Sequence, residues 1–71
     1  MKINNYEINV KDNFIHIKNY INVIDINSNK IRIKVKNNTL LIYGCNLIAT
    51  AMDEYEIVIN GCIKSIEFIN E

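Results

Sequence analysis

Few side chains in this chain of 71 residues have types that could do chemistry: one histidine, two cysteines and eight carboxylates. His16 has no serine or cysteine partner motif that would make it a general base, so it is interpreted as a surface or half-buried strand residue. The adjacent Asp53 and Glu54 are typical of a turn, not of two carboxylates that converge across a cleft. We therefore predict no catalytic residue and no enzymatic activity.

The two cysteines, Cys45 and Cys62, each follow a glycine, so we expect them to occupy equivalent bends. A metal site needs about four ligands of the histidine or cysteine type at short spacings. The chain holds too few of them, and we predict no metal and no other cofactor. In a reducing cytoplasm both thiols are expected to be free. A bridge between them stays open, because it depends on a Cα distance that the sequence does not give.

A row of basic residues is the most prominent surface feature of the sequence. Its members are Lys30, Arg32, Lys34 and Lys36. They alternate with isoleucine and valine, which predicts a strand with its basic side chains on the outer face. That face is either solvated or part of an edge strand that lysines protect from pairing. The functional alternative is contact with an acidic protein or with lipid headgroups.

The next segment, Thr39 to Tyr43, is apolar on both faces. Leu40 and Ile42 share one face, while Leu41 and Tyr43 share the other. We expect this strand to lie centrally, covered by the core and, if the chain associates with itself, by a second subunit. Together with the basic row, Leu41 and Tyr43 form the candidate interaction surface.

The fold class follows from alternation of apolar and polar residues, broken every six to ten residues by Asn, Asp or Gly. This pattern predicts about seven short strands. An antiparallel meander that folds into a β-sandwich or an open barrel buries it best. We predict one all-β domain over residues 1–71. No apolar run approaches the roughly 18–20 residues of a membrane span, and no secretory signal is evident, so the expected location is the cytoplasm.

Local irregularities are also expected. The alternation changes phase near Val23 and Ile24, which predicts a bulge. Asn37 and Asn38 are expected to form a two-residue hairpin turn of type I′. Gly44 and Gly61 are expected to interrupt strands, within two similar strand–glycine–strand units.

Five segments, in their order and spacing, resemble the YabP/YqfC family of sporulation proteins, and its YqfC branch more closely. They are Phe14-Ile15-His16-Ile17-Lys18-Asn19, Val23-Ile24-Asp25, Lys30-Ile31-Arg32-Ile33, Leu40-Leu41-Ile42-Tyr43-Gly44-Cys45-Asn46-Leu47 and Glu56-Ile57-Val58-Ile59-Asn60-Gly61-Cys62-Ile63-Lys64-Ser65-Ile66-Glu67-Phe68. The last segment looks like the closing run of the family. A glycine that is common in the central turn of the family is replaced here by Asn37 and Asn38, and the amino-terminal extension is short.

The resemblance implies a role in endospore formation in the mother cell of a Gram-positive bacterium, without known catalysis and with no catalytic residues to transfer. YqfC-like proteins accompany a larger membrane-associated sporulation protein, so protein–protein contacts are the expected activity, with self-association among them. The alternative is a small β-barrel regulatory or nucleic-acid-binding module. The formal net charge of zero gives that alternative no support, since phosphate binding favours an excess of basic residues.

Overall fold

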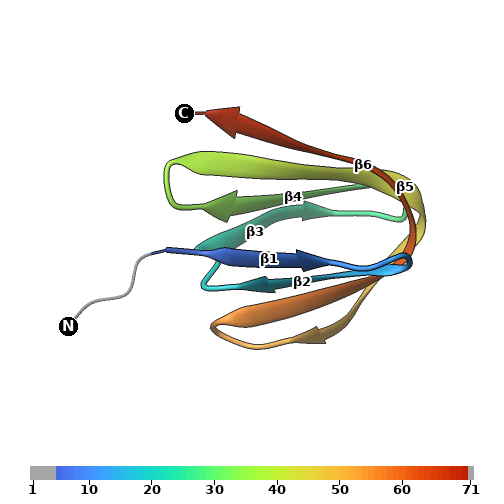
Figure 1. Ribbon diagram of the computed structural model, residues 1–71, viewed down its shortest axis with the longest axis horizontal. Coiled ribbons are helices and arrows are strands. Elements are labelled where there is room, and N and C mark those ends of the chain that lie inside the picture. Colours follow the sequence, from blue (N-terminus) through green and yellow to red (C-terminus); the bar gives the residue numbers. More distant parts are fainter. Residues whose placement is uncertain (1–4, 71) are drawn as a thin grey trace.

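In the computed structural model, residues 5–70 are described, and they form six strands and no helix (Figure 1). The strands are β1 (Glu7–Val10), β2 (Phe14–Lys18), β3 (Asn22–Ile26), β4 (Lys30–Val35), β5 (Asn38–Met52) and β6 (Glu56–Asn70). They build one antiparallel sheet in the order β1-β2-β6-β5-β4-β3. The predicted all-β class is confirmed.

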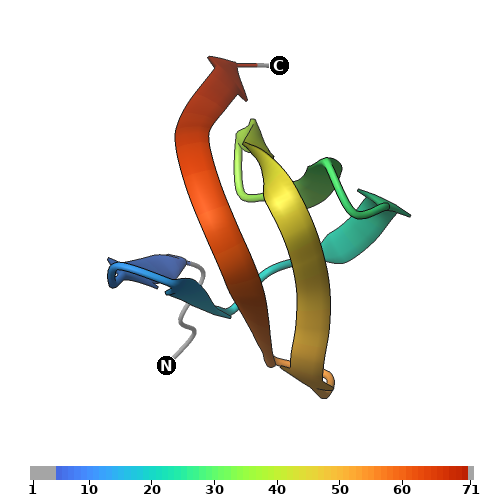
Figure 2. The same cartoon turned by 90° about the vertical axis from the view of Figure 1, so that its right-hand side faces the viewer.

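The sheet folds over on itself because β5 and β6 are long and bend together near their midpoints (Figures 1 and 2). We call the half that contains β3, β4, the start of β5 and the end of β6 the upper layer. The lower layer contains β1, β2, the start of β6 and the end of β5. The end strands β1 and β3 do not pair with each other, so the folded sheet stays open. Strands β3 to β6 form the predicted meander, whereas β6 continues to the non-consecutive β2.

The core fills the space between the two layers. Its buried members are Ile15, Ile17, Ile31, Ile33, Val35, Leu40, Ile42, Leu47, Ile57 and Ile59. Seven of the ten are isoleucines, and all but Leu47 follow the alternate positions of β2, β4, β5 and β6 that the two-residue periodicity of a strand requires. Each fully buried side chain of this size contributes about 1.5–3 kcal/mol. Because the buried residues come from strands of both layers, the two layers share one core.

The two glycines do not end strands, and this part of the prediction is wrong: β5 and β6 continue through them, giving six strands in place of about seven. The reason is close approach of the two backbones. A Cβ on Gly44 would overlap the carbonyl oxygen of Cys62, and one on Gly61 would lie 2.6 Å from the carbonyl oxygen of Asn46. Glycine therefore permits the bend while β5 and β6 stay paired on both sides of it, with shifts in register next to Gly44 and Cys45.

The turn between β4 and β5 lies one residue earlier than expected. Val35 pairs with Asn38, so Lys36 and Asn37 are the turn residues. Only Asn37 of the two has positive φ, at 68°, whereas a type I′ turn needs positive φ at both central positions. The expected Asn37–Asn38 turn is wrong because Asn38 already takes part in the sheet, paired with Asn70 as well.

The bulge in β3 is confirmed. Val23 pairs with Ile33, but Asp25 pairs with Arg32, so Ile24 is the extra residue. The register of the sheet shifts at this point, which reconciles the two phases of the alternation.

Candidate interaction surface

The histidine lies on the outer face of the lower layer, where its Nε2 atom is 2.8 Å from Glu56 Oε1. The cross-strand neighbours of His16 are Asn9 and Val58, which supply no nucleophile. Within residues 5–70, no three histidine, cysteine or acidic side chains cluster closely enough to hold a metal ion. The His16–Glu56 pair is therefore a surface contact between β2 and β6.

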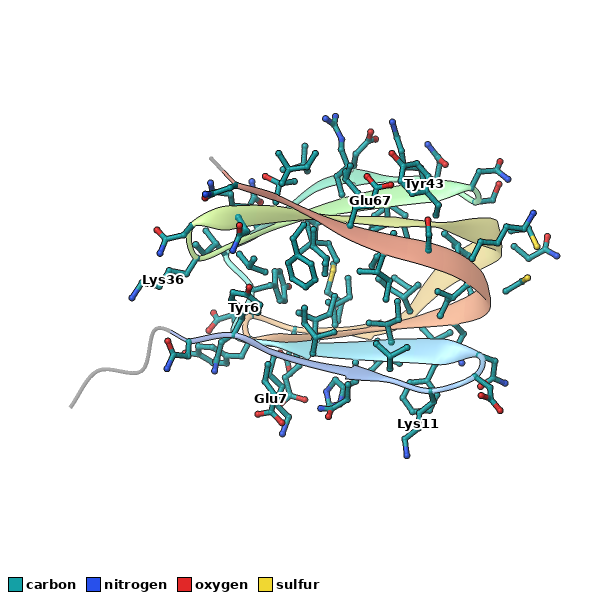
Figure 3. All side chains as sticks on the ribbon, turned by 45° about the horizontal axis from the view of Figure 1, so that its top comes forward. Tyr6, Glu7, Lys11, Lys36, Tyr43 and Glu67 are labelled. Carbon is teal, nitrogen blue, oxygen red and sulfur yellow. The ribbon has the colours of Figure 1, made fainter. Side chains whose placement is uncertain are left out.

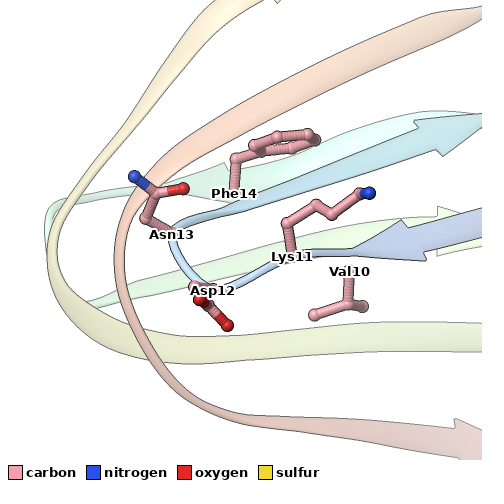
Figure 4. Close-up of a pocket in the computed structure, with 5 residues that line it drawn as sticks. All are labelled: Val10, Lys11, Asp12, Asn13 and Phe14. Atoms are coloured by element: carbon pink, nitrogen blue, oxygen red, sulfur yellow. The ribbon is translucent and has the colours of Figure 1, made fainter.

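A shallow depression lies at the turn between β1 and β2 (Figure 4). It is lined by Val10, Lys11, Asp12, Asn13 and Phe14. Its acidic and basic side chains come from adjacent turn residues and are exposed. A turn of this kind does not provide the enclosed, largely apolar walls that a small-molecule site requires.

The predicted interaction surface comes together on the outer face of the upper layer. In the register of β4 and β5, Lys30 lies opposite Tyr43, and Arg32 lies opposite Leu41. Lys34 occupies the next outward position of β4, opposite Thr39. A basic column thus runs directly beside a largely apolar one. Figure 3 shows Tyr43 and Glu67 on this outer face, while Tyr6 lies between the layers.

Two members of the predicted surface differ from expectation in their surroundings. Lys36 lies in the turn and is exposed beyond the end of the basic column. Leu41 is already buried within the chain, with 7% of its surface exposed. Its neighbours on this face are Arg32 on β4 and Glu67 on β6, whose aliphatic stems can cover it. Leu41 thus needs no second subunit to cover it.

Arg32 is the charged residue at the centre of this face, and it forms an ion pair with Asp25. Its Nη2 atom lies 3.3 Å from Asp25 Oδ2 on β3. This contact is longer than the about 2.7–2.9 Å of a strong charge-assisted hydrogen bond. The Nε atom of Arg32 is buried and has no hydrogen-bond partner in the described part of the chain. The guanidinium is therefore only loosely satisfied by its own chain.

The edge strand β3 adds a feature that the sequence reasoning did not identify. Ile24 and Ile26 are 44% and 43% exposed, and the preceding Ile21 is 61% exposed. The strand holds no lysine and no proline, so its five-residue length and its bulge at Ile24 are the features that limit pairing at this edge. Alternation alone could not reveal this surface, because edge position depends on which strands pair.

The two cysteines meet where β5 and β6 bend. Cys45 and Cys62 are direct cross-strand partners, so the expectation of equivalent bends is confirmed. Both thiols are free, Cys45 being half-buried and Cys62 exposed. A hydrogen bond with the Cys62 side chain, together with desolvation, raises the pKa of Cys45. The two thiol groups thus lie beside each other.

No helix within the described residues is long and apolar enough to span a membrane. No family model matches the chain, and no curated protein or solved structure is significantly similar to it.

Proposed function

We propose that this chain is a non-enzymatic sporulation protein that acts by protein–protein contact in the mother-cell cytoplasm. Its docking surface consists of the β3 edge, the adjoining basic column of β4 and, from β5, the half-buried Tyr43. The observation that carries this proposal is the edge of β3, where Ile24 and Ile26 are exposed and no strand of the described residues pairs along the outer side. Such an edge is a ready template for a strand from another protein.

The basic column defines which strand would fit. Neighbouring strands lie about 4.8 Å apart, so a strand added to β3 would lie about 10 Å from β4. Acidic side chains on its outward face would then be within reach of Lys30 and Arg32. Arg32 is suited to this contact because its ion pair with Asp25 is long, at 3.3 Å. We therefore propose a partner segment with apolar and acidic residues in alternation.

The resemblance to the YabP/YqfC family supports the sporulation role. It rests on the ordered segments from Phe14 to Phe68. The same resemblance supports a membrane-associated sporulation protein as the partner. Arginine and tyrosine side chains are enriched in protein interfaces, and this face offers the half-buried Arg32 and Tyr43.

Deletion of the gene in the source bacterium tests the biological role. We expect a marked drop in heat-resistant spores and recovery when the wild-type gene is restored. An unchanged spore count in the deletion strain would remove the sporulation role.

Replacement of Ile24 by Lys tests the docking surface in the restored strain. A charge at the exposed bulge of β3 should block strand addition while leaving the fold intact, because Ile24 is 44% exposed. The matched control is Ile48→Lys, at an isoleucine of the lower layer that is 58% exposed. We expect Ile24→Lys to reproduce the deletion and Ile48→Lys to restore spores, at equal protein levels on immunoblots. Full spore yield with Ile24→Lys would exclude the β3 edge as the docking surface.

A further inference from the structure

The bend shared by β5 and β6 brings together the only two cysteines of the chain. Directly opposed residues of antiparallel strands have Cα atoms about 4.5 or 5.5 Å apart, depending on the hydrogen-bonding position. A disulfide needs about 4.4–6.8 Å between Cα atoms. Both of these spacings fall within the range that a disulfide requires.

We propose that Cys45 and Cys62 form a reversible cross-strand disulfide, which makes the bend a redox modification site for low-molecular-weight disulfides. This inference does not depend on the proposed sporulation role. It rests on the strand register, on the exposure of Cys62 and on the proximity of the two side chains.

The exchange proceeds in two steps. The Cys62 thiolate attacks one sulfur of a disulfide such as oxidised glutathione, forming a mixed disulfide and releasing one glutathione thiolate. Cys45 then loses its proton and attacks the Cys62 sulfur, which releases the second glutathione. The protein gives up two protons and two electrons, and one glutathione disulfide becomes two thiols.

The surroundings set the order of attack. Cys62 is exposed and accessible to a small disulfide, whereas Cys45 is half-buried. The hydrogen bond between the thiols raises the pKa of Cys45, so less of Cys45 is present as the reactive thiolate. Cys62 therefore acts as the attacking thiol and Cys45 as the resolving one.

The bridge would fix the bend on which the two layers depend. It closes a loop that contains the end of β5 and the start of β6. Closing a loop of this size restricts the unfolded chain and raises the unfolding temperature of a domain this small by roughly 12–24 °C. After oxidation a covalent bond, in addition to the close backbone approach that the glycines allow, holds β5 and β6 together at the bend.

The test uses the wild-type chain at low concentration in buffers of reduced and oxidised glutathione. We expect intact-mass spectrometry to show a monomer that has lost two hydrogen atoms, with the loss reversed by dithiothreitol and the unfolding temperature higher in the oxidised form. Thiols that stay open to alkylation in oxidised glutathione would overturn the proposal. So would stable glutathione adducts on both residues or a disulfide-linked dimer.

Single variants test the order of attack. Cys45→Ser should accumulate a glutathione adduct at Cys62, whereas Cys62→Ser should form its adduct at least about fivefold more slowly. Circular dichroism shows whether each variant keeps the sheet. The wild-type measurements of mass and unfolding temperature test the disulfide even if neither variant folds. Faster adduct formation in Cys62→Ser would reverse the assigned roles.

Discussion

At Gly61 the backbone of β6 has a φ of 139° and passes close to the backbone of β5 near Asn46. An alanine here would be strained by its φ, and its Cβ would meet a carbonyl oxygen at 2.6 Å. Relief requires the two central strands to move apart.

We therefore expect Gly61→Ala to lower the free energy of unfolding by about 3 kcal/mol or more. A domain of this length has about 4–10 kcal/mol in total. Urea unfolding followed by circular dichroism measures the loss. Ser65→Ala, at an exposed position of the same strand, should change the midpoint little. Equal midpoints for Gly61→Ala and Ser65→Ala would contradict the close approach at the bend.

Asp53 orders the turn between β5 and β6. Its Oδ1 atom accepts hydrogen bonds from the backbone N–H groups of Tyr55 at 2.8 Å and Glu56 at 2.9 Å. These hydrogen bonds, the one from Tyr55 foremost, hold the pKa of Asp53 below its ordinary value of 3.8. A carboxyl with a lowered folded-state pKa stabilises the fold fully above its ordinary value. That stabilisation is lost as the pH falls through the folded-state pKa.

Asp53→Ala should consequently be less stable than wild type at pH 7, and the difference should shrink as the pH falls below 3.8. Thermal unfolding across this pH range measures the difference. Glu54→Ala, in the same turn, reports the general effect of removing an exposed carboxylate. A difference for Asp53→Ala that stays constant down to pH 2 would mean that the hydrogen bonds do not act through the charged carboxylate.

At the scale of elements, the turn between β4 and β5 depends on one residue with positive φ. An L-residue in the left-handed region costs about 1–2 kcal/mol, and asparagine tolerates that region better than alanine does. Asn37→Ala should therefore lower the free energy of unfolding by about 1 kcal/mol. Lys36→Ala should have little effect, since Lys36 is exposed and lacks positive φ. Chemical denaturation gives the free energy of unfolding of both variants. A larger loss for Lys36→Ala than for Asn37→Ala would contradict the assignment of Asn37 as the strained turn residue.

The positions of the strands could be predicted from the sequence because alternation is a local signal. Lys30 to Val35 shows this most clearly, since Ile31, Ile33 and Val35 are buried as expected. The glycines were misleading for a physical reason. Gly44 reads as a strand end in isolation, but it serves the approach of Cys62 from another strand.

Only part of the candidate surface could be predicted from the sequence, because alternation is a local signal. The shared face of Lys30, Arg32 and Leu41 follows from alternation together with hairpin pairing. The exposed edge of β3 does not, because it requires that β2 pair with the distant β6. Long-range pairing of this kind leaves no trace in the periodicity of either strand.

At the scale of the whole molecule, the two strand–glycine–strand units make equivalent backbone contacts. The N–H of Gly44 donates to Asn29 O in the β3–β4 turn, and the N–H of Gly61 donates to Asn13 O in the β1–β2 turn. Each hairpin thus attaches by its turn to the bend of one long strand. Since β5 and β6 continue through both layers, neither layer has a sheet of its own.

This connection predicts that the two layers unfold together. Ile17→Val removes a buried methylene in the lower layer, and Ile33→Val removes one in the upper layer. Each should cost about 1 kcal/mol. Because the core is shared, each variant should lower hydrogen-exchange protection in β2 and β4 by the same factor, as a single cooperative unit requires. Loss of protection confined to the substituted layer would contradict this prediction. It would show that the layers unfold independently and that the bend of β5 and β6 is a hinge between them.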